Sequence, residues 1–250
     1  MQSLKHLIST TPTSRTSYEL IDHLVYLKTY MIKAFYILIS FILPYSCATN
    51  QDRHAESGSK ISIQYDEQEG DMTAYFASGC FWCVESIFES VKGVKEAISG
   101  YAGGKIKNPT YQQVASGSTR HAEAVRVIYD PTIISYETLV LVFYGSHDPT
   151  TLNQQGPDRG YQYRSAIFYK TAEEKEIAER VTAMLSEEKV YNSPITTEIA
   201  PFTNFYDAEE YHQNFERKNP NQSYVRAVSI PRLKRFQNKF PELLKEDLSH

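Results

Sequence analysis

The segment that most constrains the fold of this chain is an expected strand that passes directly into an expected helix. Residues Met72 to Ser78 alternate in the way of a half-buried strand. Apolar residues then recur at helical spacing, which predicts a helix over residues 81–91. Gly79 allows a tight turn between the two elements. Cys80 therefore falls where a strand turns into a helix.

Two cysteines, Cys80 and Cys83, occupy the start of that helix. Backbone N–H groups at a helix N-terminus have no intrahelical partner and favour an anion, so we expect Cys80 to tend towards thiolate. Cys83 lies one turn further on, where side chains are about 5–6 Å apart at Cβ. A disulfide could join the two sulfurs after modest adjustment. The placement favours redox chemistry.

Three other interpretations of the cysteines stay open on this pattern alone. Buried cysteine often serves only as a small apolar residue. A zinc site would need four ligands, and His121, His147 and His212 do not show ligand-like spacing. A thioredoxin-type site also has two cysteines three apart at a helix start, but Phe81 and Trp82 would crowd such a dithiol. The two aromatic residues look more like the walls of a small apolar pocket.

The stretch Gly79-Cys80-Phe81-Trp82 resembles the signature of the A-type peptide methionine sulfoxide reductases. One match of four residues would be weak evidence, but further matches follow in family order over roughly residues 72–225. These segments are Gly100–Gly104, Asn108–Tyr111, His121–Val125, His147–Thr150, Gln162–Ile167 and Tyr211–Gln213. By this resemblance the chain is identified as a member of that family.

The order of the expected elements indicates an α+β fold. Strands are expected at 72–78, 94–101, 122–130 and 163–169, and helices at 81–91, 110–116, 135–146 and 171–189. The βαββαβ order suits a two-layer α/β plait, a ferredoxin-like core around a mixed sheet, which is also the fold that the resemblance implies. Residues 148–160 are expected to form a polar loop. Asp207 with Glu210 predicts a capping box that starts a helix to about Lys218.

The resemblance also implies roles for individual residues. Cys80 is the expected nucleophile, which attacks the sulfoxide sulfur and ends as a sulfenic acid. Glu123 is the expected acid, kept protonated near neutral pH because apolar neighbours desolvate it. Tyr111 and Tyr163 are expected to donate hydrogen bonds to the sulfoxide oxygen. Asp158 is expected to order water and hydrogen bonds at the site.

The remaining roles concern the methyl group and the recycling of the enzyme. Phe81 and Trp82 are expected to bracket the S-methyl group. Cys83 is the expected resolving thiol, because the segment from residue 221 to residue 250 has no cysteine and Cys47 lies in the leader. Thioredoxin or a similar dithiol would then reduce the disulfide.

No metal, flavin or nicotinamide cofactor is implied. A general dithiol–disulfide oxidoreductase and a non-catalytic, lipid-anchored binding module are the alternative functions.

The chain is expected to consist of a leader, a linker and one catalytic domain. A basic start, a short apolar run from Ala34 to Leu43 and a cysteine soon after it, Cys47, are typical of a lipoprotein signal peptide, with Cys47 as the lipid anchor. The expected divisions are an over-extended start at 1–30, the signal peptide at 31–47, a flexible linker at 48–70, the catalytic domain at 71–228 and a C-terminal helical extension at 229–250. The expected location is the bacterial cell envelope, lipid-anchored or periplasmic, or the cytoplasm if the leader is not a functional signal.

The composition and net charge of the chain limit the classes of molecule that it can bind. A chain of 250 residues with 41% apolar content can bury one substantial core. Its formal charge is −4 and no Lys/Arg cluster stands out, so nucleic-acid binding has no electrostatic basis. Three cysteines are too few for a disulfide scaffold. We expect a monomer that acts on oxidised proteins and free methionine sulfoxide.

Overall fold

The computed structural model describes residues 69–246 of the chain. The expected start, the signal peptide with Cys47 and nearly all of the linker lie outside the described residues. Within the described part, none of the helices has both the length and the apolar character needed to cross a membrane.

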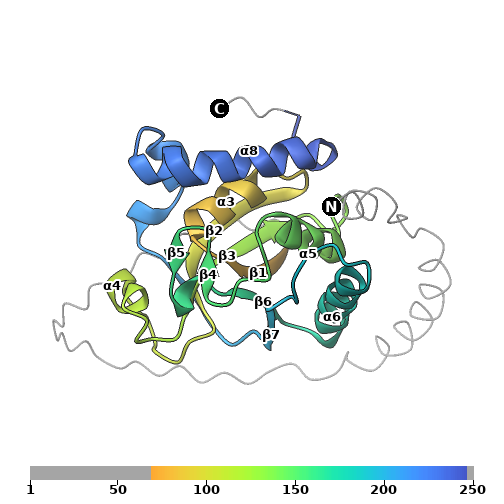
Figure 1. Ribbon diagram of the computed structural model, residues 1–250, viewed down its shortest axis with the longest axis horizontal. Helices are drawn as coiled ribbons and strands as arrows, with labels where there is room; N and C mark the ends of the chain where they lie inside the picture. Colours follow the sequence, from red (N-terminus) through yellow and green to blue (C-terminus); the bar gives the residue numbers. More distant parts are fainter. Residues whose placement is uncertain (1–68, 247–250) are drawn as a thin grey trace, which may run out of the picture. The chain divides into compact units, whose positions relative to one another are not determined.

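A six-stranded sheet forms the centre of the described residues (Figure 1). Its strand order is β7-β6-β1-β3-β2-β8, and neighbouring strands are antiparallel except β6 and β7, which are parallel. The strands are β1 (Met72–Ser78), β2 (Val94–Ala102), β3 (Ala122–Tyr129), β6 (Ser165–Tyr169), β7 (Glu198–Pro201) and β8 (Phe205–Asp207). The fold therefore mixes helices with a mixed sheet, as the sequence predicted.

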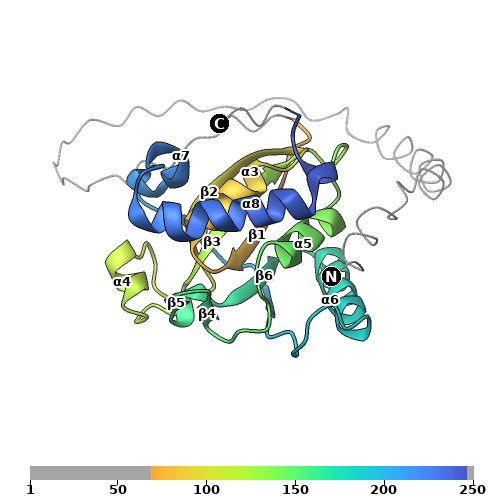
Figure 2. The same ribbon diagram turned by 45° about the horizontal axis from the view of Figure 1, so that its top comes forward.

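Helices pack against one face of this sheet, and short irregular turns link them. They are α3 (Phe81–Glu89), α4 (Tyr111–Ala115), α5 (Tyr136–Gly145), α6 (Ala172–Glu187), α7 (Phe215–Lys218) and α8 (Ile230–Lys239). Turns of 3-10 helix occur at Tyr161–Tyr163, Glu210–His212 and Pro241–Leu243, and one π-helical turn at Val225–Ser229 precedes α8. In both ribbon views α8 lies alongside α3 (Figures 1 and 2).

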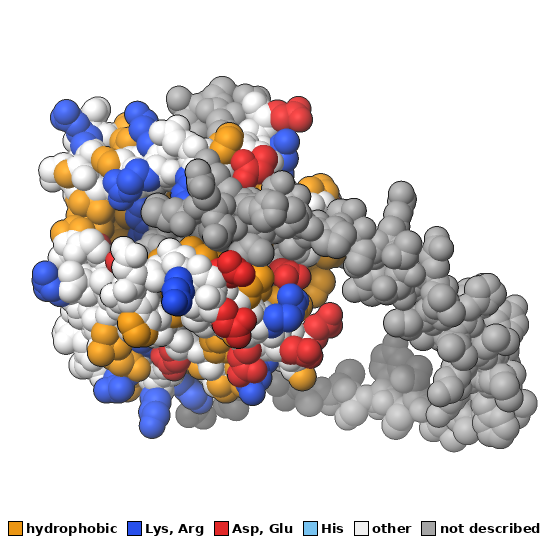
Figure 3. All heavy atoms as spheres, turned by 45° about the vertical axis from the view of Figure 1, so that its right-hand side comes forward, with side chains coloured by type: hydrophobic (Ala, Val, Ile, Leu, Met, Phe, Trp, Pro, Cys, Tyr) orange, Lys and Arg blue, Asp and Glu red, His pale blue; other side chains and the backbone are white. Residues whose placement is uncertain are grey.

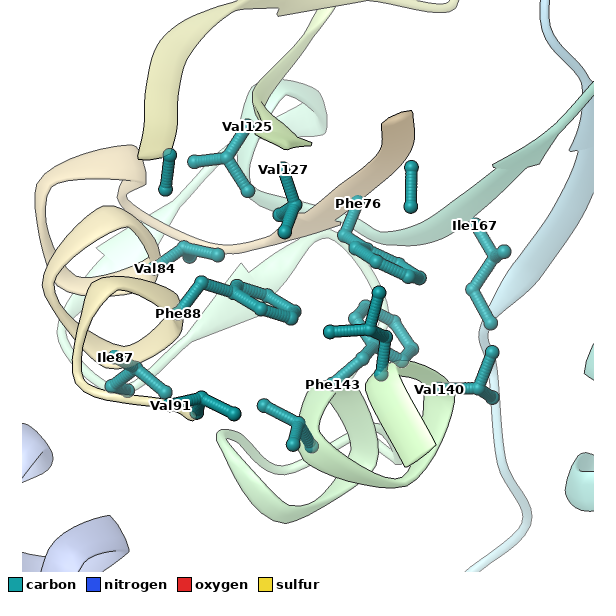
Figure 4. Close-up of a cluster of buried hydrophobic side chains, with 14 of the residues drawn as sticks. Phe76, Val84, Ile87, Phe88, Val91, Val125, Val127, Val140, Phe143 and Ile167 are labelled. Carbon is teal, nitrogen blue, oxygen red and sulfur yellow. The ribbon is translucent and has the colours of Figure 1, made fainter. Parts of the chain in front are cut away.

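The main core lies between α3, α5 and one face of the sheet (Figure 4). Phe76 of β1 stacks on Phe88 of α3, with 5.1 Å between the ring centroids, and on Phe143 of α5 at 5.5 Å. Val84 and Ile87 of α3 are fully buried beside them. Because one face of α3 is locked into this core, the first turn of the helix has a fixed place beside the end of β1.

The opposite face of the sheet carries a smaller cluster rich in alanine. Tyr75 of β1 points to this side and stacks on Phe202, with 4.0 Å between the ring centroids. Phe205 also packs against the cluster. Residues that alternate along β1 thus contribute to two different cores, which explains why nearly the whole strand is buried.

The prediction of a single helix from Asp207 to about Lys218 was wrong. Asp207 ends strand β8, and Asn214 has a φ of 55° that breaks the helical path before α7. Contacts with distant segments cause the break. The Ser99 backbone exchanges two hydrogen bonds with the Gln213 side chain (3.0 and 2.9 Å), and the Asn214 N–H donates to Glu85.

Two other boundaries also differ from the sequence expectation. The strand expected from residue 163 begins at Ser165, because Tyr163 belongs to a 3-10 turn after Gly160. The loop expected at 148–160 contains a two-stranded ribbon, β4 (Gln154–Gln155) with β5 (Asp158–Arg159). The turn and the ribbon hold Tyr163 and Asp158 in defined positions. The Lys and Arg side chains on the face in Figure 3 are spread over the surface rather than gathered in one patch.

Candidate active site

The turn between β1 and α3 places Cys80 at the N-cap of the helix. Gly79 has a φ of +94°, and a Cβ built on it would lie 2.6 Å from Gln155 Cβ, so only glycine fits this turn. The carbonyl of Cys80 accepts hydrogen bonds from the N–H groups of Cys83 (3.2 Å) and Val84 (3.3 Å). The Cys80 side chain is 6% exposed, and both Cys80 and Cys83 are free thiols.

The surroundings of Cys80 run against the expectation that it tends towards thiolate. Its side chain accepts no capping hydrogen bond from the first turn of α3. Burial raises the pKa of Cys80 well above its usual value, and the contact with Cys83 adds to that rise. The hydrogen bond from Cys80 instead lowers the pKa of Cys83 to about 6, and the charge of Arg232 acts in the same direction. The pKa of Cys83 is therefore the lower of the two.

Glu123 lies on β3 directly across from the start of α3. It is 1% exposed, and its Oε2 accepts a hydrogen bond from the N–H of Phe81 at 3.2 Å. Burial raises the pKa of Glu123 to about 8, and the charge of Asp158 raises it further. Glu123 is therefore protonated at neutral pH, as the sequence predicted.

Two tyrosines reach Glu123 and Cys80 from separate elements. Tyr163 hydrogen-bonds Glu123 through its side chain, and Tyr111 comes from the first turn of α4. Burial raises the pKa of Tyr111 to about 12, with Glu123 and Cys80 adding to the effect. Burial followed by the charge of Glu123 likewise raises the pKa of Tyr163. Both phenols are therefore hydrogen-bond donors at neutral pH.

Phe81 and Trp82 form an aromatic wall next to Cys80. The ring of Phe81 lies 5.0 Å from His212 and 6.5 Å from Tyr111, centroid to centroid. Trp82 stacks on Phe215 at 3.7 Å, and its Nε1–H donates to Nδ1 of His212 at 3.1 Å. These contacts fix the orientation of both rings.

Asp158 reaches the site through Tyr224, a residue that the sequence reasoning missed. The Tyr224 hydroxyl donates to Oδ2 of Asp158 at 2.5 Å, and Tyr224 also hydrogen-bonds Cys80. Burial raises the pKa of Asp158. In a chain with 19 tyrosines, nothing local distinguishes Tyr224. His212 was also missed, although the segment Tyr211–Gln213 that contains it matched the family pattern.

The structure thus brings together Cys80, Cys83, Phe81, Trp82, Tyr111, Glu123, Asp158 and Tyr163. Within residues 69–246, no group of three or more His, Cys, Asp and Glu side chains is arranged to hold a metal ion. The chemistry available here is that of a thiol pair beside a neutral carboxylic acid and two phenols.

Comparisons with known proteins point in one direction. A family model described as peptide methionine sulfoxide reductase matches residues 72–244. The chain is 48% identical over 183 residues to peptide methionine sulfoxide reductase MsrA 1 of Rhodopirellula baltica, covering 73% of this chain and 94% of that protein. It is 46% identical over 172 residues to MsrA of Deinococcus radiodurans, covering 69% of this chain and 84% of that protein.

Two solved structures are also similar. Methionine sulfoxide reductase A of Corynebacterium diphtheriae has a TM-score of 0.56 at 38% identity, over 62% of this chain and 78% of its own. Mxr1 from Saccharomyces cerevisiae in its reduced form has a TM-score of 0.59 at 34% identity, over 66% of this chain and 94% of its own.

Proposed function

The chain belongs to the A-type peptide methionine sulfoxide reductase family, and we propose that it reduces the S epimer of methionine sulfoxide with Cys80 as nucleophile. Its substrates would be oxidised proteins and free methionine sulfoxide, and it would act as a monomer. The observation that carries the proposal is a protonated Glu123 bonded to the first N–H of α3, directly after Cys80.

In the first step the Cys80 sulfur attacks the sulfoxide sulfur while Glu123 gives its proton to the sulfoxide oxygen. The thiol proton of Cys80 replaces the one that Glu123 gives up, so Glu123 is protonated again after this step. Methionine then leaves and the oxygen stays on Cys80 as a sulfenic acid. The sulfoxide has gained two electrons and Cys80 has lost two.

Substrate orientation follows from three contacts that meet at the sulfoxide. The hydroxyl groups of Tyr111 and Tyr163 donate to its oxygen. The rings of Phe81 and Trp82 hold the methyl group, with sulfur–aromatic attraction of about 0.3–1.5 kcal/mol. Asp158, bonded to Tyr224, keeps the hydrogen-bond network beside Cys80 in order. Three fixed contacts to three different substituents make the site chiral, so one epimer is selected.

Recycling would proceed through a disulfide between Cys80 and Cys83. Their position one turn apart at the start of α3 supports this pairing. Thioredoxin or a thioredoxin-like dithiol would then reduce the disulfide by thiol–disulfide exchange.

The test is dithiothreitol-driven reduction of the two separated epimers of a methionine sulfoxide peptide. We expect consumption of the S epimer and none of the R epimer. Equal consumption of both epimers contradicts the proposed selectivity. Turnover of insulin disulfides without consumption of either epimer identifies a general dithiol oxidoreductase instead. A thiol reagent that fails to react with Cys80 at neutral pH, together with no turnover, identifies a non-catalytic binding module.

We further propose that residues 31–47 direct the enzyme to the cell envelope and that Cys47 carries a lipid. A basic start, a short apolar run and a following cysteine support this proposal. Its reductant would then be a thioredoxin-like protein outside the cytoplasm. Fractionation of cells with and without Cys47→Ala tests the location. Soluble cytoplasmic enzyme with an intact leader contradicts it.

We also propose that the central elements form a ferredoxin-like α/β plait. The strand order β6-β1-β3-β2 and the chain order β1-α3-β2-β3-α5-β6 support this description. The outer strands β7 and β8 extend that sheet at its two edges.

A further inference from the structure

Cys83 packs against a segment that lies far along the chain. Its Sγ is 3.1 Å from Oγ of Ser229, across a separation of 146 residues, and both side chains are buried. Ser229 ends the π-helical turn that leads into α8. The hydroxyl can donate to the sulfur, and such a donor stabilises a thiolate more than a thiol.

Arg232 lies one turn further along the same segment and is 7% exposed. Its Nε donates to the Ser146 carbonyl at 2.9 Å, and its Nη2 to the Ser78 carbonyl at 2.8 Å. Ser78 is the last residue of β1, directly before the turn that carries Cys80. The guanidinium is therefore held at the turn before Cys80, where its Nη1 lies 3.5 Å from a Cβ built on Gly79; α8, which carries Arg232, runs alongside α3 in Figure 2.

The charge of Arg232 is not neutralised by an adjacent carboxylate. The salt bridges formed by residues 69–246 do not include it. A buried cation without a paired anion is costly, and a nearby thiolate would offset that cost. After the hydrogen bond from Cys80, the charge of Arg232 is the largest influence that lowers the pKa of Cys83.

Other ionisable groups also face Cys83, and most oppose its ionisation. Asp158 raises the pKa of Cys83, and burial does so as well. The groups coupled to Cys83 are Cys80 on its own turn, Asp158 on β5, Glu123 on β3, Glu216 on α7, Tyr224 before the π-helical turn and Arg232 on α8. Arg232 is the one cation in this set, so its charge must balance the acidic neighbours.

We propose that Arg232 and Ser229 are positioning residues that hold Cys83 ready as the thiolate for the resolving step. This inference rests on the proposed function, in which Cys80 becomes a sulfenic acid. The Cys83 thiolate attacks the Cys80 sulfur and forms the S–S bond while the S–O bond breaks. The hydroxyl group takes the proton of Glu123 and leaves as water. The Cys80 sulfur is reduced in this step and the Cys83 sulfur is oxidised.

The first experiment measures the ionisation of Cys83 without any turnover. In a full-length Cys47→Ala, Cys80→Ser background Cys83 is the only remaining cysteine, and the ultraviolet absorbance of its thiolate reports its titration. Arg232→Gln keeps a donor for the two carbonyls but removes the charge, and should raise the midpoint by about one pH unit. Arg232→Lys keeps the charge and should stay near the parent. Arg235→Gln, on the exposed side of α8, is the matched control.

Ser229→Ala gives an independent measurement, because it removes only a hydroxyl from the buried contact. We expect a smaller rise of the Cys83 midpoint than in Arg232→Gln. If Arg232→Gln does not fold, an unchanged midpoint in Ser229→Ala overturns the proposal. If Arg232→Gln folds, an unchanged midpoint of the Cys83 titration in that variant overturns the proposal.

The second experiment follows one turnover in the protein with both cysteines. In Arg232→Gln, disulfide formation at neutral pH should slow about tenfold for each pH unit of the midpoint shift, and should recover at higher pH. Methionine release in the first turnover should stay within about threefold of wild type. Normal disulfide formation with a normal pH profile in this variant overturns the inference. Absence of methionine from the wild-type protein overturns the proposed function instead, and the titration above still decides the role of Arg232.

Discussion

At the residue scale, Cys80 is the proposed nucleophile, although burial raises its pKa. Cys80→Ser should abolish sulfoxide reduction, because a hydroxyl group at neutral pH is a far weaker nucleophile than sulfur. Methionine formation from a sulfoxide peptide with dithiothreitol measures the effect. Activity within about tenfold of wild type would remove Cys80 from the mechanism.

If Glu123 is the proposed acid, we expect it to give the chemical step its pH dependence. Burial raises the pKa of Glu123 to about 8, so the acid form is present below that pH and is lost above it. The single-turnover rate of methionine formation should therefore fall as the pH rises through about 8. Glu123→Gln should lower the rate by about 10²–10⁴-fold and remove this part of the profile. A variant with the wild-type rate and profile would assign the acid role elsewhere.

The resolving role proposed for Cys83 is needed for every turnover after the first, but not for the first. Cys83→Ser should release one methionine per enzyme and then stop when thioredoxin is the reductant. A dimedone-type probe should label the sulfenic acid trapped on Cys80. The control is Cys47→Ala, which should leave steady turnover unchanged. Continued thioredoxin-dependent turnover in Cys83→Ser would show that Cys83 does not resolve the intermediate.

At the element scale, α3 carries a buried acid on the turn after the cysteines. Ser99 and the N–H of Asn214 donate to Glu85, yet burial raises its pKa from 4.5 to about 8. A raised carboxyl pKa contributes stability that is complete below the unfolded value and is lost as the pH rises through the folded one. The stability contribution of Glu85 is therefore lost between about pH 4.5 and pH 8.

Glu85→Gln removes that titration while keeping the shape. The fall in the free energy of unfolding between pH 5 and pH 9 should be smaller in this variant than in wild type, as measured by urea unfolding. Exposed Glu173 on α6 is a matched site for the control change Glu173→Gln. An equal fall in wild type and Glu85→Gln would mean that Glu85 does not titrate between these pH values.

Local sequence signals predicted most elements well and failed where distant contacts decide. The alternation in Met72–Ser78 gave β1 with its observed bounds, and Thr171 caps α6 through the N–H of Glu174. The capping pattern at Asp207 failed because Gln213 and Asn214 bond to other segments, which outweighs a cap worth about 1 kcal/mol.

The residues of the candidate site likewise fall into those that local motifs predicted and those that only distant contacts bring in. Motifs around Cys80 and Glu123 identified side chains that the fold does bring together. The sequence analysis missed Tyr224 and Arg232. Both lie in the last described segment, and only the fold brings that segment next to the cysteines. The ionisation of Cys80 was also misjudged, since a helix start alone predicts a thiolate and says nothing of burial or of the neighbouring sulfur.

At the scale of the whole molecule, the last described segment is part of the same core as the sheet. Phe240 is fully buried, 5.2 Å from Phe236, and it packs against Gly145 at the end of α5. Phe240→Ala should cost about 3–5 kcal/mol of unfolding free energy, measured by urea denaturation. Asn238→Ala, at an exposed position of α8, is the control. A loss below about 1 kcal/mol would mean that this segment packs loosely.

The long path between Cys83 and its partners has a consequence for biosynthesis. A chain that grows from its N-terminus exposes the reactive cysteines long before residues 229–240 have been made. Ser229, Arg232 and Phe240 are supplied only near the end of translation. A product cut short by a premature stop therefore carries both sulfurs but neither the finished core nor the buried cation. We therefore expect reductase activity only from chains that extend through residues 229–240, and none from the truncated products.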